Sequence, residues 1–276
     1  MRPIKIPSDI LHHWQLDNAS AEAIAAIHAR LQAFKKGAPE VSVVIPAYNE
    51  KDSIVKTLSS LSANNTNRSV EIIVVNNNSA DNTRELAIAC GATCIDETKQ
   101  GITNARNAGL NYATGKYVLN ADADSIYPST WIEEMVSPLA NGNAAALTYG
   151  QFAFIPVGKT TRNTYFFYEY FADFTRWINK TFREEAVNVY GFNSGFRREQ
   201  GLSVEGFDHP PGTNEDGFLA LKLRNKGFGK LHCVPASKSL VWTTDRRILL
   251  DGGIQQATFK RVKRMLGMKM EETRNV

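Results

Sequence analysis

Cysteine is scarce in this sequence, and the common signals of secretion and membrane insertion are missing. Of 276 residues only Cys90, Cys94 and Cys233 are cysteine, and no further Cys or His pair lies at zinc-site spacing. The N-terminus has no apolar signal-peptide core, and no run approaches about eighteen uninterrupted apolar residues. We therefore expect a reducing, cytoplasmic location, with neither a disulfide framework nor a membrane-spanning helix.

The body of the chain also lacks an excess of charge. The net charge is +4, but residues 246–276 hold eight Lys and Arg against three Asp and Glu, so residues 1–245 carry −1. A basic terminal segment predicts a local anionic partner, a diphosphate or a membrane surface, and we expect no nucleic-acid binding by the body. A hydrophobic content of 43% and a charged content of 22% exclude a mostly disordered or coiled-coil chain.

Short apolar runs and longer helical runs alternate in the first half of the chain. The predicted strands are 41–46, 71–75, a short run near 92–95 and 116–121, and the predicted helices are 51–63, 81–90 and 102–113. This alternation favours a mostly parallel sheet covered by helices on both faces. Residues 21–36 have apolar residues at helical spacing and are predicted to form an accessory helix. After residue 140 the rhythm breaks, and one further helix is predicted over 215–226.

Polar clusters follow three of the predicted strands. One of them is Asp122-Ala123-Asp124, which comes directly after the strand 116–121. Because the carboxyl ends of parallel strands meet at one edge, where open α/β sheets bind ligands, we expect these clusters to lie together. Two carboxylates one residue apart can reach one Mn²⁺ or Mg²⁺ ion, which prefers oxygen ligands. A solvated loop or a helix cap is the alternative for an isolated Asp-x-Asp.

Five motifs occur in an order that resembles the inverting glycosyltransferase family 2. They are Pro46-Ala-Tyr-Asn-Glu50, the segment 76–83 (NNNSADNT), the segment 101–109 (GITNARNAG), Asp122-Ala-Asp124 and Asn214-Glu-Asp-Gly217. The resemblance runs from about Val41 to about Arg247. It implies an α/β GT-A fold, with a mixed, mostly parallel sheet, a Rossmann-like nucleotide-binding half and an acceptor half.

This resemblance suggests four parts of the chain. They are an N-terminal extension with its accessory helix (1–40), the nucleotide-sugar-binding half (41–140), the acceptor-binding half (141–245) and the basic C-terminal segment (246–276).

The resemblance also implies roles for the matching residues. The donor-binding positions would be Pro46, Ala47, Tyr48, Glu50, Asn77, Arg106, Asp122 and Ala123. Asp124 would be the principal metal ligand, and Asp122 would meet a ribose hydroxyl or a water near the ion. Asp216 would be the catalytic base and Glu215 would orient the acceptor or the base, whereas helix capping is the alternative for both. Asn193 and Gly195 would lie near the transferred sugar.

Two arginines near the end of the resemblance follow Trp242-Thr-Thr-Asp245. Arg246 and Arg247 would contact the donor diphosphate, because a guanidinium can bind phosphate through two parallel hydrogen bonds. A solvated charge pair at the start of a helix is the alternative for these two side chains.

One departure from the family pattern concerns the base of the nucleotide. Asn76 and Asn77 stand where the family usually has aspartates, and an amide offers both a donor and an acceptor. UDP-sugar is therefore only slightly favoured over GDP-sugar.

The segment 165–177 is rich in aromatic residues. Its rings occur too often around a helix for one buried stripe to take them all. This pattern predicts core packing together with an oligomer contact, such as a homodimer. An acceptor wall or a membrane-interface surface, to which the basic run 260–264 would contribute charge whether or not it lies close in space, is the alternative.

Together these patterns predict a metal-dependent inverting transfer of a sugar from a nucleotide-diphosphate donor to an acceptor hydroxyl by single displacement. The acceptor would be a glycan or a lipid-linked molecule in cell-surface glycan or glycolipid synthesis, which leaves open an action at the inner face of the membrane. A noncatalytic nucleotide-sugar-binding protein is the main alternative. A haloacid-dehalogenase-like phosphohydrolase is more remote, because Ile126 stands where that motif has Thr or Val.

Overall fold

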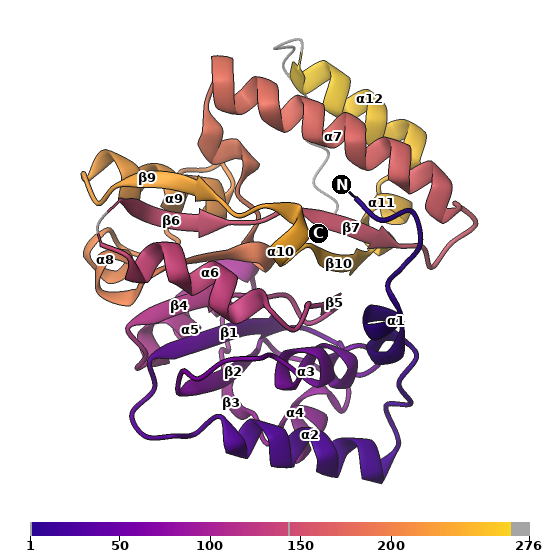
Figure 1. Cartoon of the computed structure of the whole chain (residues 1–276), viewed down its shortest axis with the longest axis vertical. Coiled ribbons are helices and arrows are strands. Elements are labelled where there is room, and N and C mark those ends of the chain that lie inside the picture. Colours follow the sequence, from indigo (N-terminus) through magenta and orange to yellow (C-terminus); the bar gives the residue numbers. More distant parts are fainter. Residues whose placement is uncertain (1, 143, 266–276) are drawn as a thin grey trace.

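Two β-sheets organise the chain in the computed structural model, which describes residues 2–142 and 144–265 (Figure 1). The larger sheet has the order β3-β2-β1-β4-β8-β6-β9, and the smaller sheet has the order β5-β10-β7. The strands of the larger sheet are β1 (Val41–Ala47), β2 (Val70–Asn76), β3 (Thr93–Asp96), β4 (Tyr117–Asn120), β6 (Ala145–Tyr149), β8 (Ser194–Arg197) and β9 (Lys230–Cys233). Those of the smaller sheet are β5 (Ser125–Ile126), β7 (Phe152–Ile155) and β10 (Val241–Thr244).

Helices and short 3-10 turns connect these strands. The helices are α1 (Ser8–Trp14), α2 (Ala21–Ala33), α3 (Ile54–Ser62), α4 (Thr83–Ala89), α5 (Ile102–Tyr112), α6 (Trp131–Ala140), α7 (Arg162–Phe182), α8 (Arg198–Ser203), α9 (Glu215–Asn225), α10 (Ala236–Ser239), α11 (Arg246–Leu250) and α12 (Gly253–Met265). The 3-10 turns are η1 (Glu185–Asn188) and η2 (Gly191–Asn193). No helix within residues 2–142 and 144–265 is both long and apolar enough to cross a bilayer.

The larger sheet is mixed and mostly parallel, as the sequence predicts. β1 pairs in parallel with β2 and β4, β2 pairs in parallel with β3, and β6 pairs in parallel with β9. Only β8 runs antiparallel to both of its neighbours, β4 and β6. Through β8 the predicted halves 41–140 and 141–245 share one continuous sheet, so side chains from both halves reach the same edge.

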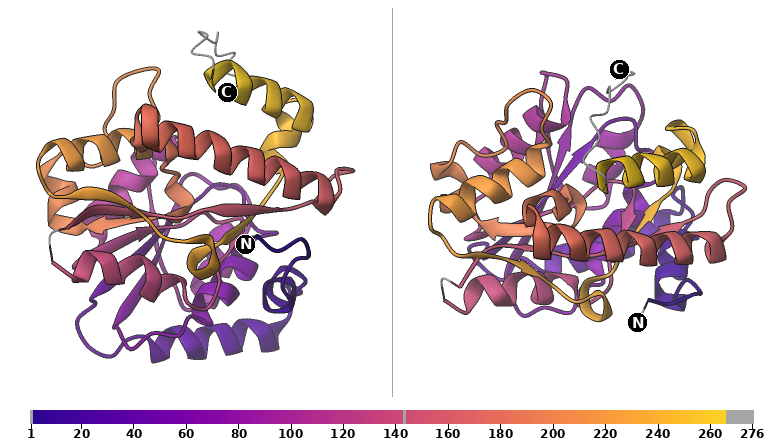
Figure 2. Two further views of the ribbon diagram at one scale, coloured as in Figure 1. Left: turned by 45° about the horizontal axis from the view of Figure 1, so that its top comes forward. Right: turned by 90° about the horizontal axis from the view of Figure 1, so that it is seen from above.

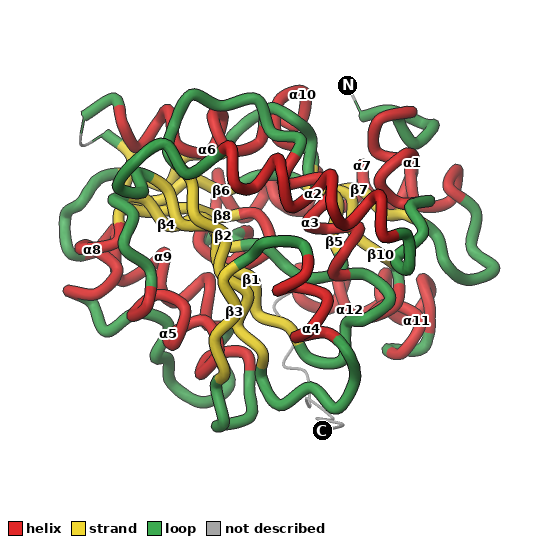
Figure 3. The backbone as a smooth tube through the Cα atoms, turned by 90° about the horizontal axis from the view of Figure 1, so that it is seen from below, coloured by secondary structure: helices red, strands yellow, loops and turns green. Residues whose placement is uncertain are grey.

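Helices cover both faces of this sheet, as seen in Figure 3. Every residue of β1 is buried, which suits a central strand between two helical layers. On one face Val43 and Ile45 lie in a core with Leu58 of α3 and Trp131 of α6. On the other face Val44 lies in a second core with residues of α5 and α9.

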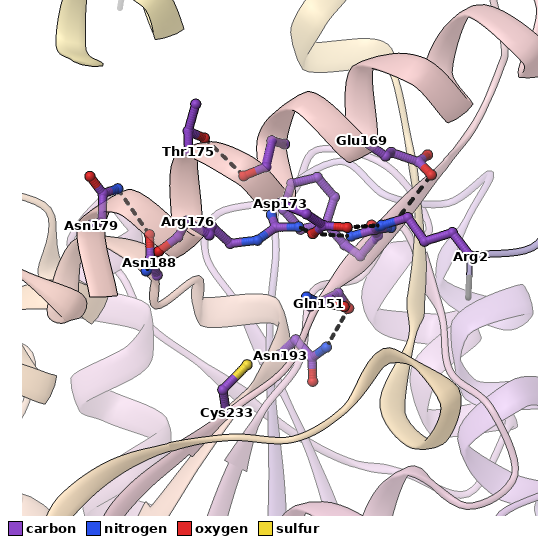
Figure 4. A network of polar contacts seen from close by, with 12 residues as sticks. Arg2, Gln151, Glu169, Asp173, Thr175, Arg176, Asn179, Asn188, Asn193 and Cys233 are labelled. Atoms are coloured by element: carbon purple, nitrogen blue, oxygen red, sulfur yellow. Dashed lines mark hydrogen bonds and ion pairs between the residues drawn. The ribbon is translucent and has the colours of Figure 1, made fainter. Parts of the chain in front are cut away.

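A separate layer of α7, α11 and α12 lies over the smaller sheet (Figure 2). Phe152 and Phe154 of β7 pack against Tyr165 and Tyr168 of α7, and Ile254 of α12 packs against the same cluster. Arg2, at the start of the chain, reaches the inner side of α7, where it is 4% exposed. Figure 4 shows its guanidinium between Glu169 and Asp173.

The predicted elements of the first half are confirmed, with shifts at their ends. The accessory helix predicted over 21–36 ends at Ala33, before the Lys-Lys-Gly sequence 35–37. The second half contains strands β6 to β10, which the sequence reasoning did not place. Residues 266–276 of the predicted basic segment lie outside the described residues.

Candidate active site

Two loops at the carboxyl edge of β1 and β2 are joined by side-chain to backbone hydrogen bonds. The N–H of Asn49 donates to Ser79 Oγ at 3.0 Å, and its side-chain Oδ1 accepts from the N–H of Ala80 at 2.8 Å. The N–H of Glu50 donates to Thr83 Oγ1 at 2.7 Å. Asn49 has φ 54°, a left-handed conformation that asparagine adopts more readily than most residues. These bonds fix the loop that carries Tyr48 and Glu50.

Asn77 holds a third loop in place. Its Nδ2 donates to the carbonyls of Glu97 and Lys99 at 2.8 and 2.9 Å, and its Oδ1 accepts from the N–H of Gly101 at 2.8 Å. The amide is therefore satisfied by the backbone of residues 97–101, and its contact with a nucleotide base stays a prediction. Two further side chains support the loop after β1. Ser79 Oγ accepts from the N–H of Asn49, and the Asp81 carboxylate accepts from the N–H groups of Thr83 and Lys51.

The Asp-x-Asp motif lies where β4 ends, beside residues from the far end of the chain. Asp124 Oδ2 accepts from Arg246 Nη2 at 3.0 Å and from Thr244 Oγ1 at 3.3 Å. The same guanidinium forms an ion pair with Glu50. Burial raises the pKa of Asp124 to about 6, repulsion from Asp122 and Glu50 adds to this effect, and Arg246 opposes it. The structure thus brings Glu50, Asp124 and Arg246 together.

A second cluster joins Asp122 to Asp216. Arg106 of α5 is 2% exposed, and its Nη2 donates to Asp122 Oδ1 at 3.0 Å. Its Nε lies 3.4 Å from Asp216 Oδ1. Asp216 lies in the first turn of α9, which begins after Asn214, whose Oδ1 accepts from the N–H of Gly217 at 2.6 Å. Helix capping is thus the task of Asn214, and the Asp216 carboxylate is turned toward Arg106.

Asp216 is buried at a place where its charge is only partly compensated. It is 5% exposed, and its Oδ1 has no hydrogen-bond donor among the described residues. Burial raises the pKa of Asp216 to about 7, Glu215 and Asp122 add to the effect, and Arg106 and the N–H of Gly191 oppose it. A carboxylate with a pKa near neutrality can take a proton from a hydroxyl group.

Gly191 allows this cluster to form. A Cβ atom at this position would overlap the Arg106 guanidinium and would come within 2.5 Å of Asp216 Oδ1. Nη1 and Nε of Arg106 have no hydrogen-bond partner among the described residues. Buried polar atoms without a hydrogen-bond partner mark a place where a ligand or a water molecule is expected.

Other predicted positions lie in the strands or at the surface. Pro46 and Ala47 belong to β1, Ala123 is 4% exposed and Tyr48 is 53% exposed. Arg247 is exposed on α11. Their contacts with a donor stay predictions.

The two positions predicted near the sugar are buried. Asn193 is 1% exposed, its Nδ2 donates to the carbonyls of Gln151 and Ser239, and its Oδ1 accepts from Trp131 Nε1. Gly195 lies in β8 against Leu119 of β4. The Asn193 amide thus supports the turn η2, and a direct contact with the sugar stays a prediction.

Sequence reasoning missed two residues that shape the site. Tyr127 accepts from the N–H of Asp122 at 2.9 Å and donates to the carbonyl of Phe192 at 3.1 Å, so it ties the Asp-x-Asp turn to η2. Thr244 lies in a motif that the sequence singles out only for its arginines. The sequence around Tyr127 gives no sign that its hydroxyl group would contact Asp122 and Phe192.

The donor set fits a hard divalent cation. No group of three or more His, Cys, Asp or Glu side chains placed to hold a metal occurs in residues 2–142 and 144–265. Mg²⁺ sites, however, often use one or two carboxylates, with phosphate and water oxygens as the remaining ligands. Asp122 and Asp124 offer two such carboxylates, and the cation that faces Asp124 and Glu50 is the half-exposed side chain of Arg246.

Comparisons with known proteins identify the family of the chain. The family model described as glycosyl transferase family 2 matches residues 42–200. The glycosyltransferase AglE of Haloferax volcanii is 33% identical over 135 residues, which is 46% of this chain and 44% of that protein. The probable glycosyltransferase YdaM of Bacillus subtilis is 28% identical over 70% of this chain and 48% of its own length. The chain thus spans less than half the length of these curated relatives.

Solved structures match over more of the chain at low identity. The mannosyltransferase PcManGT of Pyrobaculum calidifontis, in complex with GDP-Man and Mn²⁺, has a TM-score of 0.55 and 20% identity over 84% of this chain and 67% of its own. The glucosyl-3-phosphoglycerate synthase of Mycobacterium tuberculosis, in complex with Mn²⁺, UDP-Glc and phosphoglyceric acid, has a TM-score of 0.52 and 20% identity over 90% of this chain and 85% of its own. The predicted GT-A fold is confirmed, and with the match over residues 42–200 the chain belongs to glycosyltransferase family 2.

Proposed function

We propose that this protein transfers a sugar from a nucleotide-diphosphate donor to an acceptor hydroxyl, with inversion at the anomeric carbon. The observation that carries the proposal is the buried Asp216, which lies 3.4 Å from the arginine that also holds Asp122 of the Asp-x-Asp motif. The Arg106 side chain therefore contacts both Asp216, the proposed proton acceptor, and Asp122, which would lie beside the diphosphate. Solved structures of similar fold bind UDP-Glc or GDP-Man, which supports a nucleotide-sugar donor.

The donor would lie at the carboxyl edge of β1, β2 and β4. Pro46, Ala47, Tyr48 and Glu50 would line the nucleoside pocket, and Asn77 would hold the loop 97–101 beside it. Asp124 and Asp122 would hold Mn²⁺ or Mg²⁺, which when bound supplies positive charge to the departing diphosphate.

Arg246 and Arg247 would serve the same diphosphate. The Arg246 guanidinium is half exposed and contacts Glu50 and Asp124 through Nη2, so it would exchange these carboxylates for a phosphate when a divalent cation takes its place beside Asp124.

Asp216 would act as the general base. Its carboxylate takes the proton of the acceptor hydroxyl while that oxygen attacks the anomeric carbon and the bond to the diphosphate breaks. One carboxylate is sufficient for a single displacement, and no covalent sugar intermediate forms. Glu215, next to it at the start of α9, would orient the acceptor.

The acceptor is proposed to be a glycan or a lipid-linked hydroxyl. One similar protein, WfgD of Escherichia coli, is named as a glucosyltransferase that uses a diphosphoundecaprenol-linked sugar, and it is 29% identical over 42% of this chain. A role in cell-surface glycan or glycolipid synthesis follows as part of the same proposal.

The test uses water as the acceptor, because the natural acceptor is not needed to observe inversion. The protein with Mn²⁺ is incubated with UDP-glucose or GDP-mannose, and the anomer of the released sugar is recorded by NMR before it equilibrates. We expect the anomer opposite to that of the donor, no release after chelation of the metal, and at least a ~100-fold slower release by Asp216→Asn. Retention of configuration, or full activity of that variant, would contradict the proposal.

A further inference from the structure

One face of α7 is aromatic and turned to solvent. Its exposed rings belong to Phe167, Tyr170, Phe174 and Trp177, with Phe182 at the end of the helix. Phe167 is 71% exposed and Trp177 is 54% exposed. Tyr165 and Ala172 are buried on the opposite side, because residues three or four apart share one face of a helix. Helix α7 therefore has two apolar faces, and the body of the protein covers one of them.

Neighbouring rings along this face contact one another in two groups, one toward each end of the helix. Phe174 and Trp177 stack with centroids 5.9 Å apart, and Trp177 meets Phe182 edge-on at 5.6 Å. Phe166 and Tyr170 lie 4.9 Å apart toward the start of the helix. Single apolar side chains at a surface need no explanation, but a connected apolar patch marks an interaction site.

Positive charge gathers in the same layer. Residues 156–183 and 246–265, which contain α7, α11 and α12, hold eleven Lys and Arg against three Asp and Glu, whereas the rest of the chain holds 21 against 25. Each of the three acids pairs with a cation of the same layer: Glu169 with Arg162, Asp173 with Arg176, and Asp251 with Lys260. The layer keeps an excess of eight positive charges. Lys263 lies 4.7 Å from the ring of Phe259, which is 56% exposed on α12.

The two helices lie side by side over β7. Arg261 of α12 donates to Thr175 Oγ1 of α7 at 3.0 Å, and Ile254 and Ala257 share a cluster with Tyr168. Figure 2 shows α7 and α12 together on one face of the molecule. The aromatic patch and the basic helix therefore belong to one surface, which we name the α7–α12 surface.

We propose that the α7–α12 surface docks onto an anionic lipid bilayer. Trp and Tyr are stable at the boundary between lipid headgroups and acyl chains, and Phe adds apolar area that water does not solvate well. Lys and Arg beside such rings attract anionic headgroups. The combination on one surface fits a bilayer interface.

A second copy of the chain does not fit this surface as well. Two-fold symmetry would place the same surface of each copy face to face. The positive charge of the two layers would then repel, and this repulsion is weaker only at high salt. A homodimer, where it forms, is therefore expected to use another face.

Docking through this surface would place the candidate active site near the lipid. Helix α11 begins at Arg246, which contacts Asp124, and leads directly into α12. Tyr190 and Phe192, on either side of Gly191, pack in the cluster that also contains Tyr168 of α7. A lipid-linked acceptor is the class that this arrangement favours, and this step rests on the proposed function.

Vesicle sedimentation tests the docking without donor or acceptor. The full chain is mixed with vesicles of phosphatidylcholine alone or of an equimolar mixture with phosphatidylglycerol. We expect binding to the mixed vesicles that weakens with added NaCl, and little binding to phosphatidylcholine alone. Phe167→Ser/Phe174→Ser should weaken binding by more than about tenfold. Ile88→Ser/Tyr112→Ser, which removes two exposed apolar side chains elsewhere, should bind like the wild type.

Three further variants separate the contribution of charge from that of ring contact. Lys180→Gln and Lys263→Gln should each weaken binding by about fivefold. Trp177→Phe should still sediment with the vesicles but should lose the quenching of tryptophan fluorescence by brominated lipid.

The proposal is overturned if the wild type does not sediment with the mixed vesicles, if it binds duplex DNA in preference to them, or if Phe167→Ser/Phe174→Ser binds as the wild type does. Because no nucleotide is present in these assays, their failure is distinguishable from a failure of the transfer reaction.

Discussion

At the scale of single residues, Arg106 connects the two chemical tasks of the site. Its guanidinium contacts Asp122, two residues before the proposed metal ligand Asp124, and Asp216, the proposed base. The buried Arg106 guanidinium opposes the increase that burial causes in the pKa of Asp216. Substitution at Arg106 is therefore expected to change donor binding and proton transfer together.

The pH dependence of transfer should report the state of Asp216. Burial raises the pKa of this group to about 7, with Glu215 and Asp122 adding to the increase and Arg106 opposing it. Only the carboxylate accepts a proton, so kcat/KM should fall by about tenfold for each pH unit below 7 and should level off above it. Initial rates at saturating Mn²⁺ between pH 5.5 and about 9 would measure this.

The Asp216→Asn variant is the control. Its residual kcat/KM should no longer fall with decreasing pH, because the titrating carboxylate is gone. A wild-type profile that stays flat from pH 8 down to about 5 would contradict the assignment of the base.

The site residues differ in how far sequence could predict them. Asp122 and Asp124 directly follow a strand, so their place at the sheet edge was predictable from local sequence. The ion pair between Arg106 and Asp216 was not, because 110 positions separate these two residues and only the folded sheet brings them together. The burial of Asn77 and Asn193 was likewise hidden, since an asparagine in a polar loop gives no sign of which backbone groups it will bind.

At the scale of elements, the close approach of α5 to the central strands depends on Gly109. A Cβ atom at this position would overlap Cγ1 of Val44 and would lie 3.1 Å from Cγ2 of Val75. Both valines are fully buried, so the strands cannot move aside without disturbing the sheet.

Gly109→Ala should therefore lower the free energy of unfolding by about 1–3 kcal/mol, although alanine is the better helix former. Urea denaturation followed by circular dichroism would give this value. Asn111→Ala, at an exposed position of the same helix, should change stability by less than about 0.5 kcal/mol. An equal or greater stability of Gly109→Ala would show that the packing of α5 is looser than described.

The elements of the first half were predictable because each strand is followed by its own helix. Such units form from contacts that are local in sequence, and the apolar runs of 41–46 and 71–75 are long enough to identify. Strands β8 and β10 are different, because each has four residues and pairs with strands distant in the chain. Their short sequences, such as Ser-Gly-Phe-Arg, carry no period that distinguishes strand from loop.

At the scale of the whole molecule, the N-terminal segment ties α7 to the rest of the fold. Arg2 donates to Asp173 through Nε at 2.5 Å and through Nη2 at 2.9 Å, and its Nη1 also contacts Glu169 and the carbonyl of Phe152. The chain then continues to α1, which lies against α3 (Figure 1).

Arg2→Met should lower the free energy of unfolding by about 3 kcal/mol, because Asp173 and Glu169 lose a buried partner. Thermal unfolding of this variant and of Arg30→Met, which removes an exposed arginine on α2, would separate the buried ion pair from a general loss of charge. A melting temperature of Arg2→Met equal to that of Arg30→Met would contradict the anchoring role.

The basic surface of the protein also forms only in the folded molecule. The sequence locates a basic excess in residues 246–276, but α7 contributes to the same surface from residues some eighty positions earlier. The rings of α7 alone do not predict the α7–α12 surface, and the lysines of α12 alone do not predict it either. Only the tertiary fold brings the two helices together.

We propose that Asp124 holds the metal ion of a nucleotide site and that Asp216 is the general base but does not hold the nucleotide. Thermal unfolding with UDP or GDP, each with and without Mn²⁺, tests it directly on the wild type, Asp124→Asn and Asp216→Asn. A ligand at a hundred times its Kd stabilises a fold by about 2.7 kcal/mol, which raises the melting temperature by several degrees. We predict a Mn²⁺-dependent increase for the wild type and Asp216→Asn and none for Asp124→Asn. No increase with either nucleotide in the wild type, or an equal increase in Asp124→Asn, would contradict the claim.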